Sequence, residues 1–472
     1  MKNKLYILLF ILLASGIISC KKVVEGINND PNSPQDADAI TMLTGVEISD
    51  VVVQEGETAR QCSVWNGNFT GEQFQYLSLN QYLMIAQDFN PTWELIYASS
   101  LKNARLMKNK AYQTHNLQLV GVAQTIEANL MGTATALWGD VPFSQATSTN
   151  FPNPAFDPQA TVYTAVQALL DSAIVNFNST AFTAFAAQDV FFAGNMPKWI
   201  QTANTLKARY YMHVRDYNSA LTAATNGISS AANNFLAPHS TLSTGTYNLY
   251  YQFMALSRPG FMDAKGAYAV SLINPAGANY RGNTKTIEKA RFSYLYSSAT
   301  NPNYTTNGFF YESVSFPMAS YAENLLDLAE CDFRINGFNN GLARLNTFRA
   351  YMSAGGYIGA TYLTAGNYKY DPYVAADFAA GGIENNTATK LANDRALLRE
   401  IMEERYVTFI GQIEGFNDTR RVRKETDISV PIPPTTGTSI PQRMLYPQIE
   451  VDLNKSTPNP IPGLFTPTTV NN

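Results

Sequence analysis

Cysteine, histidine and charged residues are all scarce in this chain of 472 residues. It has three cysteines and three histidines, and 15% of its residues are charged, with a net charge of −4. His115, His213 and His239 lack metal-ligand spacing, so no zinc or other metal site is expected. Without a basic block, nucleic acid is not an expected partner. The sequence has neither a G-x-S-x-G elbow nor a phosphate-binding glycine loop, so no catalytic nucleophile or cofactor is predicted.

Long hydrophobic runs are also missing, apart from one at the N-terminus. Lys2 and Lys4 precede an uncharged, mostly apolar run from Leu5 to Ile18. That run is too short to span a bilayer as a helix, and it ends just before Cys20. The pattern is typical of a bacterial lipoprotein signal, in which residues 1–19 are removed and Cys20 is lipidated. The alternative is an ordinary secretory peptide with an incidental cysteine, and both place the mature protein outside the cytoplasm.

Two cysteines remain for other roles. Cys62 and Cys331 are far apart in sequence, so a disulfide between them depends on a geometry that the sequence does not give. Cys331 lies on an apolar helical face, which favours a buried free thiol.

Hydrophobic residues make up 45% of the chain and follow helical spacing over much of it. Apolar residues at three- and four-residue steps predict amphipathic helices that must pack against one another. A solenoid of stacked helix pairs is compatible with this pattern. The stripes run from Leu119 to Leu137, Val162 to Phe177, Trp199 to Val214, Met318 to Cys331 and, less regularly, Leu398 to Phe409.

Two regions, about 58–91 and 238–311, interrupt the helical pattern and are predicted to be irregular. Both place aromatic residues among Gly, Asn and Gln, and the second contains nine of the 27 tyrosines. The second is too long for a plain connector in a compact domain, and such loops usually carry function or are disordered. Its aromatic content argues against disorder.

Several strings, which occur in the order typical of the SusD/RagB family of outer-membrane nutrient-binding lipoproteins from Bacteroidota, together resemble that family. They cover nearly the whole mature chain, and they match best the branch with WGDVP and KWIQTANTLKAR strings. The strings are INNDPNSP (27–34), LWGDVPFSQA (137–146), GNMPKWIQTANTLKARYYMHV (194–214), MASYAENLLDLAEC (318–331), EERYVTFIGQIEGFNDTRR (403–421) and YPQIEVDLN (446–454).

The resemblance implies a mostly α fold in a single domain, residues 20–472. Its scaffold would be tetratricopeptide-like helix pairs, and its long irregular loop regions would form a ligand and partner face. It also implies a function without catalysis: capture of an oligosaccharide or peptide and delivery to a SusC-like TonB-dependent outer-membrane transporter. Residues 21–25 lack the acidic cluster that often marks surface export in these bacteria. The exterior location therefore rests on the family alone.

Most of the polar and aromatic residues in these strings are interpreted as structural. Gly139 and Pro142 are expected to end a helix, and Asp140 can accept bonds from free backbone N–H groups. Trp138 and Trp199 are expected in the core. The acids Glu323, Asp327 and Glu330 share one helix face, and Arg334, Arg405, Arg420 and Arg421 are available as partners, so ion pairing is favoured over catalysis.

The aromatic residues of the two irregular regions are the predicted ligand contacts. Sugars and extended peptides stack on aromatic rings while Asn, Gln and Arg side chains bond to polar edges. A role as hydrophobic anchors of the loops is the alternative. The candidates are Trp65, Asn66, Asn68, Tyr76 and Tyr82 from the first region and Tyr250, Tyr251, Phe253, Arg258 and Tyr280 from the second.

Two other functions stay open at this point. An extracellular glycan or peptide hydrolase on a helical scaffold is one, because a glycosidase needs only two carboxylates at a suitable separation. A helical-repeat adaptor that binds only proteins is the other. The preference for a glycan over a peptide rests on its prevalence in the family.

Overall fold

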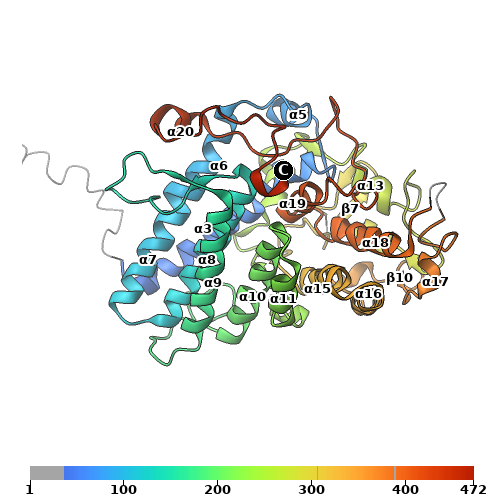
Figure 1. Cartoon of the computed structure of the whole chain (residues 1–472), viewed down its shortest axis with the longest axis horizontal. Helices are drawn as coiled ribbons and strands as arrows, with labels where there is room; N and C mark the ends of the chain where they lie inside the picture. Colours follow the sequence, from blue (N-terminus) through green and yellow to red (C-terminus); the bar gives the residue numbers. More distant parts are fainter. Residues whose placement is uncertain (1–36, 306, 387–389) are drawn as a thin grey trace, which may run out of the picture. The chain divides into compact units, whose positions relative to one another are not determined.

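Helices account for most of the regular structure in the computed structural model (Figure 1), which confirms the mostly α fold expected from the sequence. The structure describes residues 37–305, 307–386 and 390–472, and residues 39–472 form one compact unit. The predicted signal segment and Cys20 lie outside the described residues. Among the described helices, none has both the length and the apolar character needed to cross a bilayer.

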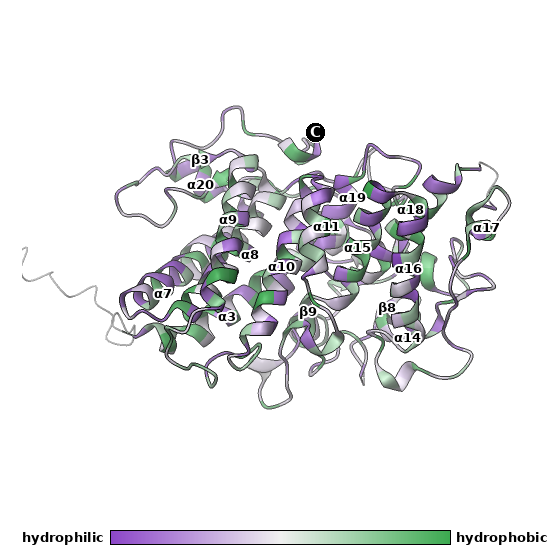
Figure 2. Ribbon diagram, turned by 60° about the horizontal axis from the view of Figure 1, so that its bottom comes forward, coloured by the Kyte–Doolittle hydropathy of each residue, from purple (hydrophilic) through white to green (hydrophobic). Residues whose placement is uncertain are grey.

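A row of long helices forms the scaffold, and each packs against the next in chain order. Figures 1 and 2 both show α3, α7, α8 and α9 gathered together, α15, α16 and α18 gathered together, and α10 and α11 between them. Short loops join α7 to α8, α10 to α11 and α15 to α16, as in antiparallel helix pairs. The bounds are α3 Ala39–Glu55, α7 Lys102–Gln113, α8 Leu117–Trp138, α9 Gln159–Phe177, α10 Met196–His213, α11 Tyr217–Thr225, α15 Tyr321–Asn336, α16 Phe338–Ser353 and α18 Asn393–Thr408.

Shorter helices connect and cover this row. They are α4 Glu57–Trp65, α5 Phe74–Asn80, α6 Asn90–Glu94, α12 Leu249–Tyr251, α13 Tyr268–Ile273, α14 Lys289–Leu295, α17 Ala375–Phe378, α19 Ile413–Arg421 and α20 Gln448–Leu453, with π-helical turns η2 Leu95–Leu101 and η5 Gln252–Ser257.

The five apolar stripes all fall on helices, namely α8, α9, α10, α15 and α18. The helix that carries the stripe from Met318 to Cys331, α15, starts later than predicted, because Met318 belongs to strand β9 (Phe316–Ala319). Ser320 sets the start of α15: its Oγ accepts a bond from the Glu323 N–H at 3.1 Å, and the Glu323 carboxylate accepts one from the Ser320 N–H at 3.4 Å. This reciprocal cap fixes the first turn at Tyr321.

The WGDVP string ends α8, as expected, and its Asp140 accepts a bond from a free backbone N–H at the start of α9. Gly139 has a φ of +85° and terminates α8. The Asp140 carboxylate accepts a bond at 2.9 Å from the N–H of Gln159, the first residue of α9. Trp138 is buried and its indole N–H donates to the Leu445 carbonyl at 2.8 Å. Trp199 is also buried, so the scaffold interpretation of both tryptophans is confirmed.

Ion pairs hold α15 against its neighbours, which confirms the structural interpretation of its acids. Arg209 on α10 contacts Glu323 at 2.7 Å, and Arg405 on α18 contacts Asp327 at 2.6 Å. Glu330 binds Arg421 at 2.6 Å. The Glu330 carboxylate is also 2.8 Å from Arg334. Arg420, the fourth arginine expected as a partner, donates to backbone carbonyls and not to these acids. Cys62 and Cys331 are buried free thiols, so no disulfide joins them and the prediction for Cys331 is confirmed.

Short antiparallel strand pairs connect segments that lie between the helices, and one pair joins the two regions predicted to be irregular. The segment predicted to be irregular from residue 58 in fact begins within α4, because residues 57–65 contain neither Gly nor Pro and pack against α3 and α19. The pairs are β1 Thr70–Gly71 with β5 Met262–Asp263, β2 Val141–Pro142 with β3 Phe156–Asp157, β4 Phe235–Ala237 with β9, β6 Thr286–Ile287 with β10 Lys369–Tyr370, and β7 Tyr296–Ser298 with β8 Asn301–Pro302.

Candidate functional site: an aromatic groove

The β1–β5 pair brings the two irregular regions into contact. Thr70 lies opposite Asp263 and Gly71 opposite Met262, and the Glu72 N–H donates to the Phe261 carbonyl at 2.9 Å. A Cβ at Gly71 would lie 1.8 Å from the Tyr76 carbonyl oxygen, so only glycine allows the chain to turn into α5 here. This turn brings the start of α5 beside the residues that precede β5.

Four aromatic rings, Phe74, Phe261, Phe253 and Tyr76, follow one another across this contact. Phe74 and Phe261 stack with centroids 4.9 Å apart, Phe261 meets Phe253 edge-on at 6.4 Å, and Phe253 lies 4.7 Å from Tyr76. Phe74 is 69% exposed and has a φ of +50°. An exposed ring on a strained backbone is costly for stability, and such strain tends to occur at functional positions.

A groove of about 260 Å³ adjoins this row of rings at Phe253, the one of the four that lines it. We call the groove and the four rings together the aromatic groove. Its polar lining comes from Glu57, Arg60 and Gln252 and from the hydroxyl side chains of Thr58, Thr92 and Ser257. The apolar residues are Val52, Pro91, Leu95, Leu249 and Phe253.

Arg60 is fixed at the edge of the groove by a closed set of hydrogen bonds. It donates to the Tyr76 hydroxyl and to the Glu57 carboxylate, both at 2.9 Å, and Tyr76 donates to the same carboxylate at 2.9 Å. Its guanidinium lies 4.4 Å above the Phe253 ring. Burial favours a lower pKa for Arg60, but Tyr76 and Glu57 outweigh it and raise the pKa, so the group stays charged. Burial raises the pKa of Tyr76, which keeps its hydroxyl protonated.

Two π-helical turns border the groove. η2 contributes Leu95, and η5 contributes Gln252, Phe253 and Ser257. π-Helical turns are rare and occur frequently at functional sites. Their position here therefore supports a functional reading of this groove.

The chemistry available in the aromatic groove is binding. Ring faces are available for stacking, and Arg60 and Gln252 can bond to polar edges. Glu57 is the only acid among the described residues that line the groove, and it is already engaged by Arg60 and Tyr76; a glycosidase requires two carboxylates. Within the described ranges, no group of three His, Cys, Asp or Glu side chains is arranged to hold a metal ion.

Three of the predicted contact residues lie at this site. Phe253 lines the groove, Tyr76 orients Arg60, and the exposed Arg258 lies 5.8 Å from the centre of the Phe261 ring. Ligand contact by these residues stays a prediction, because the protein is described without a ligand.

Four other predicted contacts lie in the interior. Trp65 is 1% exposed and packs against Phe89 and Phe416, and its indole N–H donates to the Leu79 carbonyl at 3.1 Å. Trp65 and Tyr82 both line a small cavity of about 130 Å³, apart from the aromatic groove. Asn66, Asn68 and Tyr250 are also buried. Tyr406 donates to the backbone of Asn66, Tyr296 to that of Asn68, and Tyr250 to that of Gly411. Their positions fit the alternative interpretation, in which they anchor the loops to the scaffold.

The last three predicted contacts lie apart from the aromatic groove. The Tyr82 hydroxyl accepts a bond from the Thr435 N–H at 3.1 Å. Tyr251 packs against Tyr247 and Tyr311. The Tyr280 hydroxyl accepts a bond from the Glu288 N–H at 3.2 Å. The ten predicted residues therefore do not form one continuous surface.

Sequence reasoning missed Phe74, Phe261 and Arg60. Phe74 and Phe261 both lie in the regions predicted to bear ligand contacts, but Trp and Tyr were preferred there. A usable signal was present for Phe261, since it follows Pro259-Gly260, a turn that presents the next side chain at the surface. Gly260 has a φ of +79° in the structure.

Comparison with known proteins gives a family match over the part of the chain that contains this groove. The family model SusD-like_2, described as "Starch-binding associating with outer membrane", matches residues 31–265. No curated protein matches the chain.

Solved structures share the fold over most of the chain. A SusD/RagB family protein from Bacteroides thetaiotaomicron is 20% identical, with a TM-score of 0.65 over 89% of this chain and 95% of that protein. A chitin-binding SusD homolog from Flavobacterium johnsoniae is 16% identical, with a TM-score of 0.65 over 91% and 97%. A SusD homolog from Bacteroides uniformis is 17% identical, with a TM-score of 0.60 over 93% and 100%. The chain belongs to the SusD-like family.

Proposed function

We propose that the chain is a glycan-binding lipoprotein of the outer membrane and that the aromatic groove is its ligand site. The observation that carries the proposal is the stacked pair of Phe74 and Phe261, which lies at the surface and is connected through Phe253 to the fixed guanidinium of Arg60. A sugar ring presents an apolar C–H face to such rings and polar hydroxyl edges to Arg60 and Gln252. The family is described as starch-binding and the Flavobacterium johnsoniae homolog as chitin-binding, which supports the same ligand class.

A neutral glycan fits this site better than a peptide. Among the described residues that line the groove, the one acid, Glu57, is neutralised by Arg60. An extended peptide is usually bound through main-chain hydrogen bonds to a sheet edge, whereas β1 and β5 are two residues each. The groove offers rings rather than a strand edge, so stacking is the interaction it supplies.

The anchor and the partner complete the proposal. Removal of residues 1–19 would leave Cys20 as the lipidated N-terminus, and the acyl chains would hold the protein at the outer membrane, facing the exterior. From there it would pass its ligand unaltered to a SusC-like TonB-dependent transporter. The family's association with the outer membrane supports this location.

Affinity gels that contain neutral polysaccharides or short peptides test the ligand class. We expect retardation of the purified protein by at least one neutral glycan, with the glycan recovered uncleaved. Release of shorter products would indicate the hydrolase instead. Retardation by peptides alone would contradict the glycan assignment. So would a protein that is retarded by none of these ligands and binds only other proteins.

A further inference from the structure

A second cavity, of about 210 Å³, lies within the irregular side of the molecule. It is bounded by the β4–β9 pair, the start of α15, the end of α16 and the end of α18, and it shares no lining residue with the groove. Core aromatics lie between the two sites: Tyr250, the neighbour of groove residue Leu249, is 4.9 Å from Phe310, which is 4.8 Å from cavity residue Phe309. The two sites are therefore separate.

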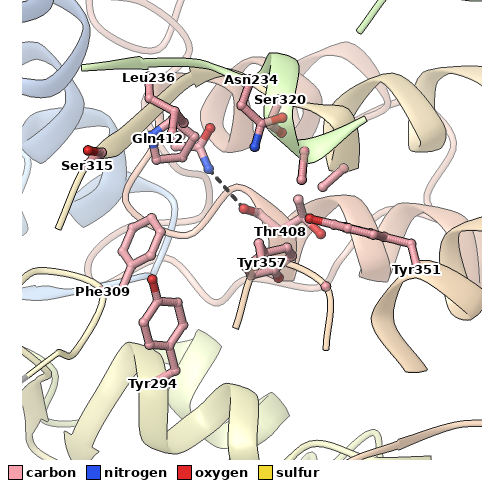
Figure 3. Close-up of a pocket in the computed structure, with 14 residues that line it drawn as sticks. Asn234, Leu236, Tyr294, Phe309, Ser315, Ser320, Tyr351, Tyr357, Thr408 and Gln412 are labelled. Atoms are coloured by element: carbon pink, nitrogen blue, oxygen red, sulfur yellow. Dashed lines mark hydrogen bonds between the residues drawn. The ribbon is translucent and has the colours of Figure 1, made fainter. Parts of the chain in front are cut away.

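Two buried hydroxyls of this cavity lack well-formed hydrogen bonds. Thr408 is 7% exposed, and among the described residues neither its Oγ1 nor the Tyr357 hydroxyl has a partner at good hydrogen-bond geometry, although the two hydroxyls lie close enough to interact with each other. Buried polar groups are nearly always hydrogen-bonded, because an unmade bond costs free energy. Both side chains line the cavity (Figure 3). These hydroxyls are therefore available to a polar occupant.

Further polar groups around the cavity are already oriented. Gln412 donates its amide N–H to the Thr408 carbonyl at 3.0 Å, as the dashed line in Figure 3 shows, which leaves its side-chain oxygen as an acceptor. The Asn234 oxygen accepts a bond from the Tyr321 N–H at 2.7 Å, and its amide nitrogen points toward the cavity. The Ser320 hydroxyl accepts a bond from Glu323 and so retains its own proton to donate.

Aromatic rings supply the apolar part of the lining. Tyr294 and Phe309 meet edge-on with centroids 5.6 Å apart, and Tyr351 and Tyr357 approach from the opposite side (Figure 3). Burial raises the pKa of Tyr294, Tyr351 and Tyr357, so all three hydroxyls stay protonated and neutral. None of the described lining residues carries a charge. A charged ligand would lose its hydration without gaining a partner.

We propose that this cavity is a second binding site, separate from the aromatic groove, and that it accepts one neutral sugar ring. Rings combined with hydroxyls and amides match a molecule with apolar faces and polar edges. The volume is below the roughly 300 Å³ at which small-molecule pockets usually begin, so one ring fits and a longer segment does not. The ring can be a free monosaccharide or the end unit of a chain.

Removal of these two hydroxyls tests this site. Thr408→Val and Tyr357→Phe keep the shape of each side chain. Because neither hydroxyl makes a well-formed hydrogen bond in the protein, both variants should unfold close to or above the temperature of the parent. Saturation-transfer NMR and calorimetry with glucose, galactose, mannose and N-acetylglucosamine, each tested separately, should detect saturable binding of at least one sugar. The double variant should weaken it by about tenfold or more. Glucuronate should not bind.

The groove variant Phe74→Ala separates this proposal from the proposed function. It should leave monosaccharide binding intact, and the Thr408→Val/Tyr357→Phe variant should leave binding of polysaccharide at the groove intact. Disaccharides and trisaccharides built from the sugar that binds then show whether the occupant is a free monosaccharide or the end unit of a chain. Retained affinity for them identifies a chain end, and lost affinity identifies a free sugar. Absence of saturable binding by all four sugars, binding indifferent to the double variant, or binding abolished by Phe74→Ala would each overturn the second site.

Discussion

Phe74 and Phe261 stack with ring centroids 4.9 Å apart and planes 28° from parallel, although they come from two separate irregular regions. The contact exists because the β1–β5 pair aligns the two regions immediately beside both rings. Stacking normally buries ring surface, yet Phe74 remains mostly exposed. The pair is thus preorganised to receive another flat, apolar face, which is what the proposed glycan site requires.

Phe74 is predicted to compromise stability for function. Its φ of +50° is unfavourable for any residue with a Cβ, by about 1–2 kcal/mol. We therefore expect Phe74→Gly to be more stable than Phe74→Ala by about 1 kcal/mol, while both lose glycan affinity. Thermal denaturation of the two variants measures the difference. Equal stability, or a more stable alanine variant, would show that the backbone is not strained there.

Tyr76 is predicted to matter through its hydroxyl. Tyr76→Phe keeps the ring against Phe253 but removes the bond from Arg60 and the bond to Glu57. Because both bonds involve a charged group, the expected loss in unfolding free energy is about 1–3 kcal/mol. Urea denaturation measures it. Tyr112→Phe is the control: Tyr112 is 44% exposed and its hydroxyl accepts only a long bond of 3.5 Å from Gln124, so its stability should change by less than about 0.5 kcal/mol. An unchanged midpoint for Tyr76→Phe would remove Arg60 from its assigned position.

Glu330 and Arg421 form a buried pair whose loss should be severe. Arg421→Met leaves Glu330 and Asp418 buried beside fewer positive charges, and the expected cost is about 3 kcal/mol or more. Adding Glu330→Leu should recover part of that loss, which a double-mutant cycle measures. Asp171→Asn, at an exposed ion pair with Lys207, should cost less than about 1 kcal/mol. Additive effects of the two buried substitutions would contradict direct pairing.

Asp50 should make stability depend on pH. Its buried carboxylate is bonded by the amides of Asn129 and Gln54, and burial raises its pKa to about 7. Since the folded pKa is above the unfolded value of about 3.9, its stabilising contribution is full below about pH 4 and is lost as the pH rises to about 7.

The variant Asp50→Asn removes this titration. Its stability relative to the parent should improve between pH 4 and pH 8, on the order of 2–4 kcal/mol. Denaturant unfolding at several pH values measures this change. A stability difference between the two proteins that stays constant over that range would show that Asp50 does not titrate there.

The scaffold could be predicted from the sequence because amphipathic helices repeat their apolar residues at fixed intervals. The stripe from Leu119 to Leu137 lies within α8, and the acids of α15 form ion pairs with arginines, as expected. Met318 was misplaced because its spacing fits a helix equally well, and only the Ser320 cap determines where α15 begins.

The candidate site was harder to predict because exposure in irregular segments depends on contacts distant in sequence. Trp65 and Tyr250 have the composition of a sugar platform, but packing against Phe416 and Phe310 buries them. Phe74 is exposed only because the chain turns at Gly71 and meets β5. No local pattern distinguishes these outcomes.

Calorimetric titration of a neutral polysaccharide into the parent protein, the Phe74→Ala/Phe261→Ala variant and the Phe182→Ala variant is the most direct test of the ligand site. Phe182 is 50% exposed and outside the groove, so it controls for the loss of a surface phenylalanine. We predict an unchanged affinity for Phe182→Ala and a loss of about tenfold or more for the double variant. A folded double variant that binds the polysaccharide as tightly as the parent would contradict the assignment of the aromatic groove.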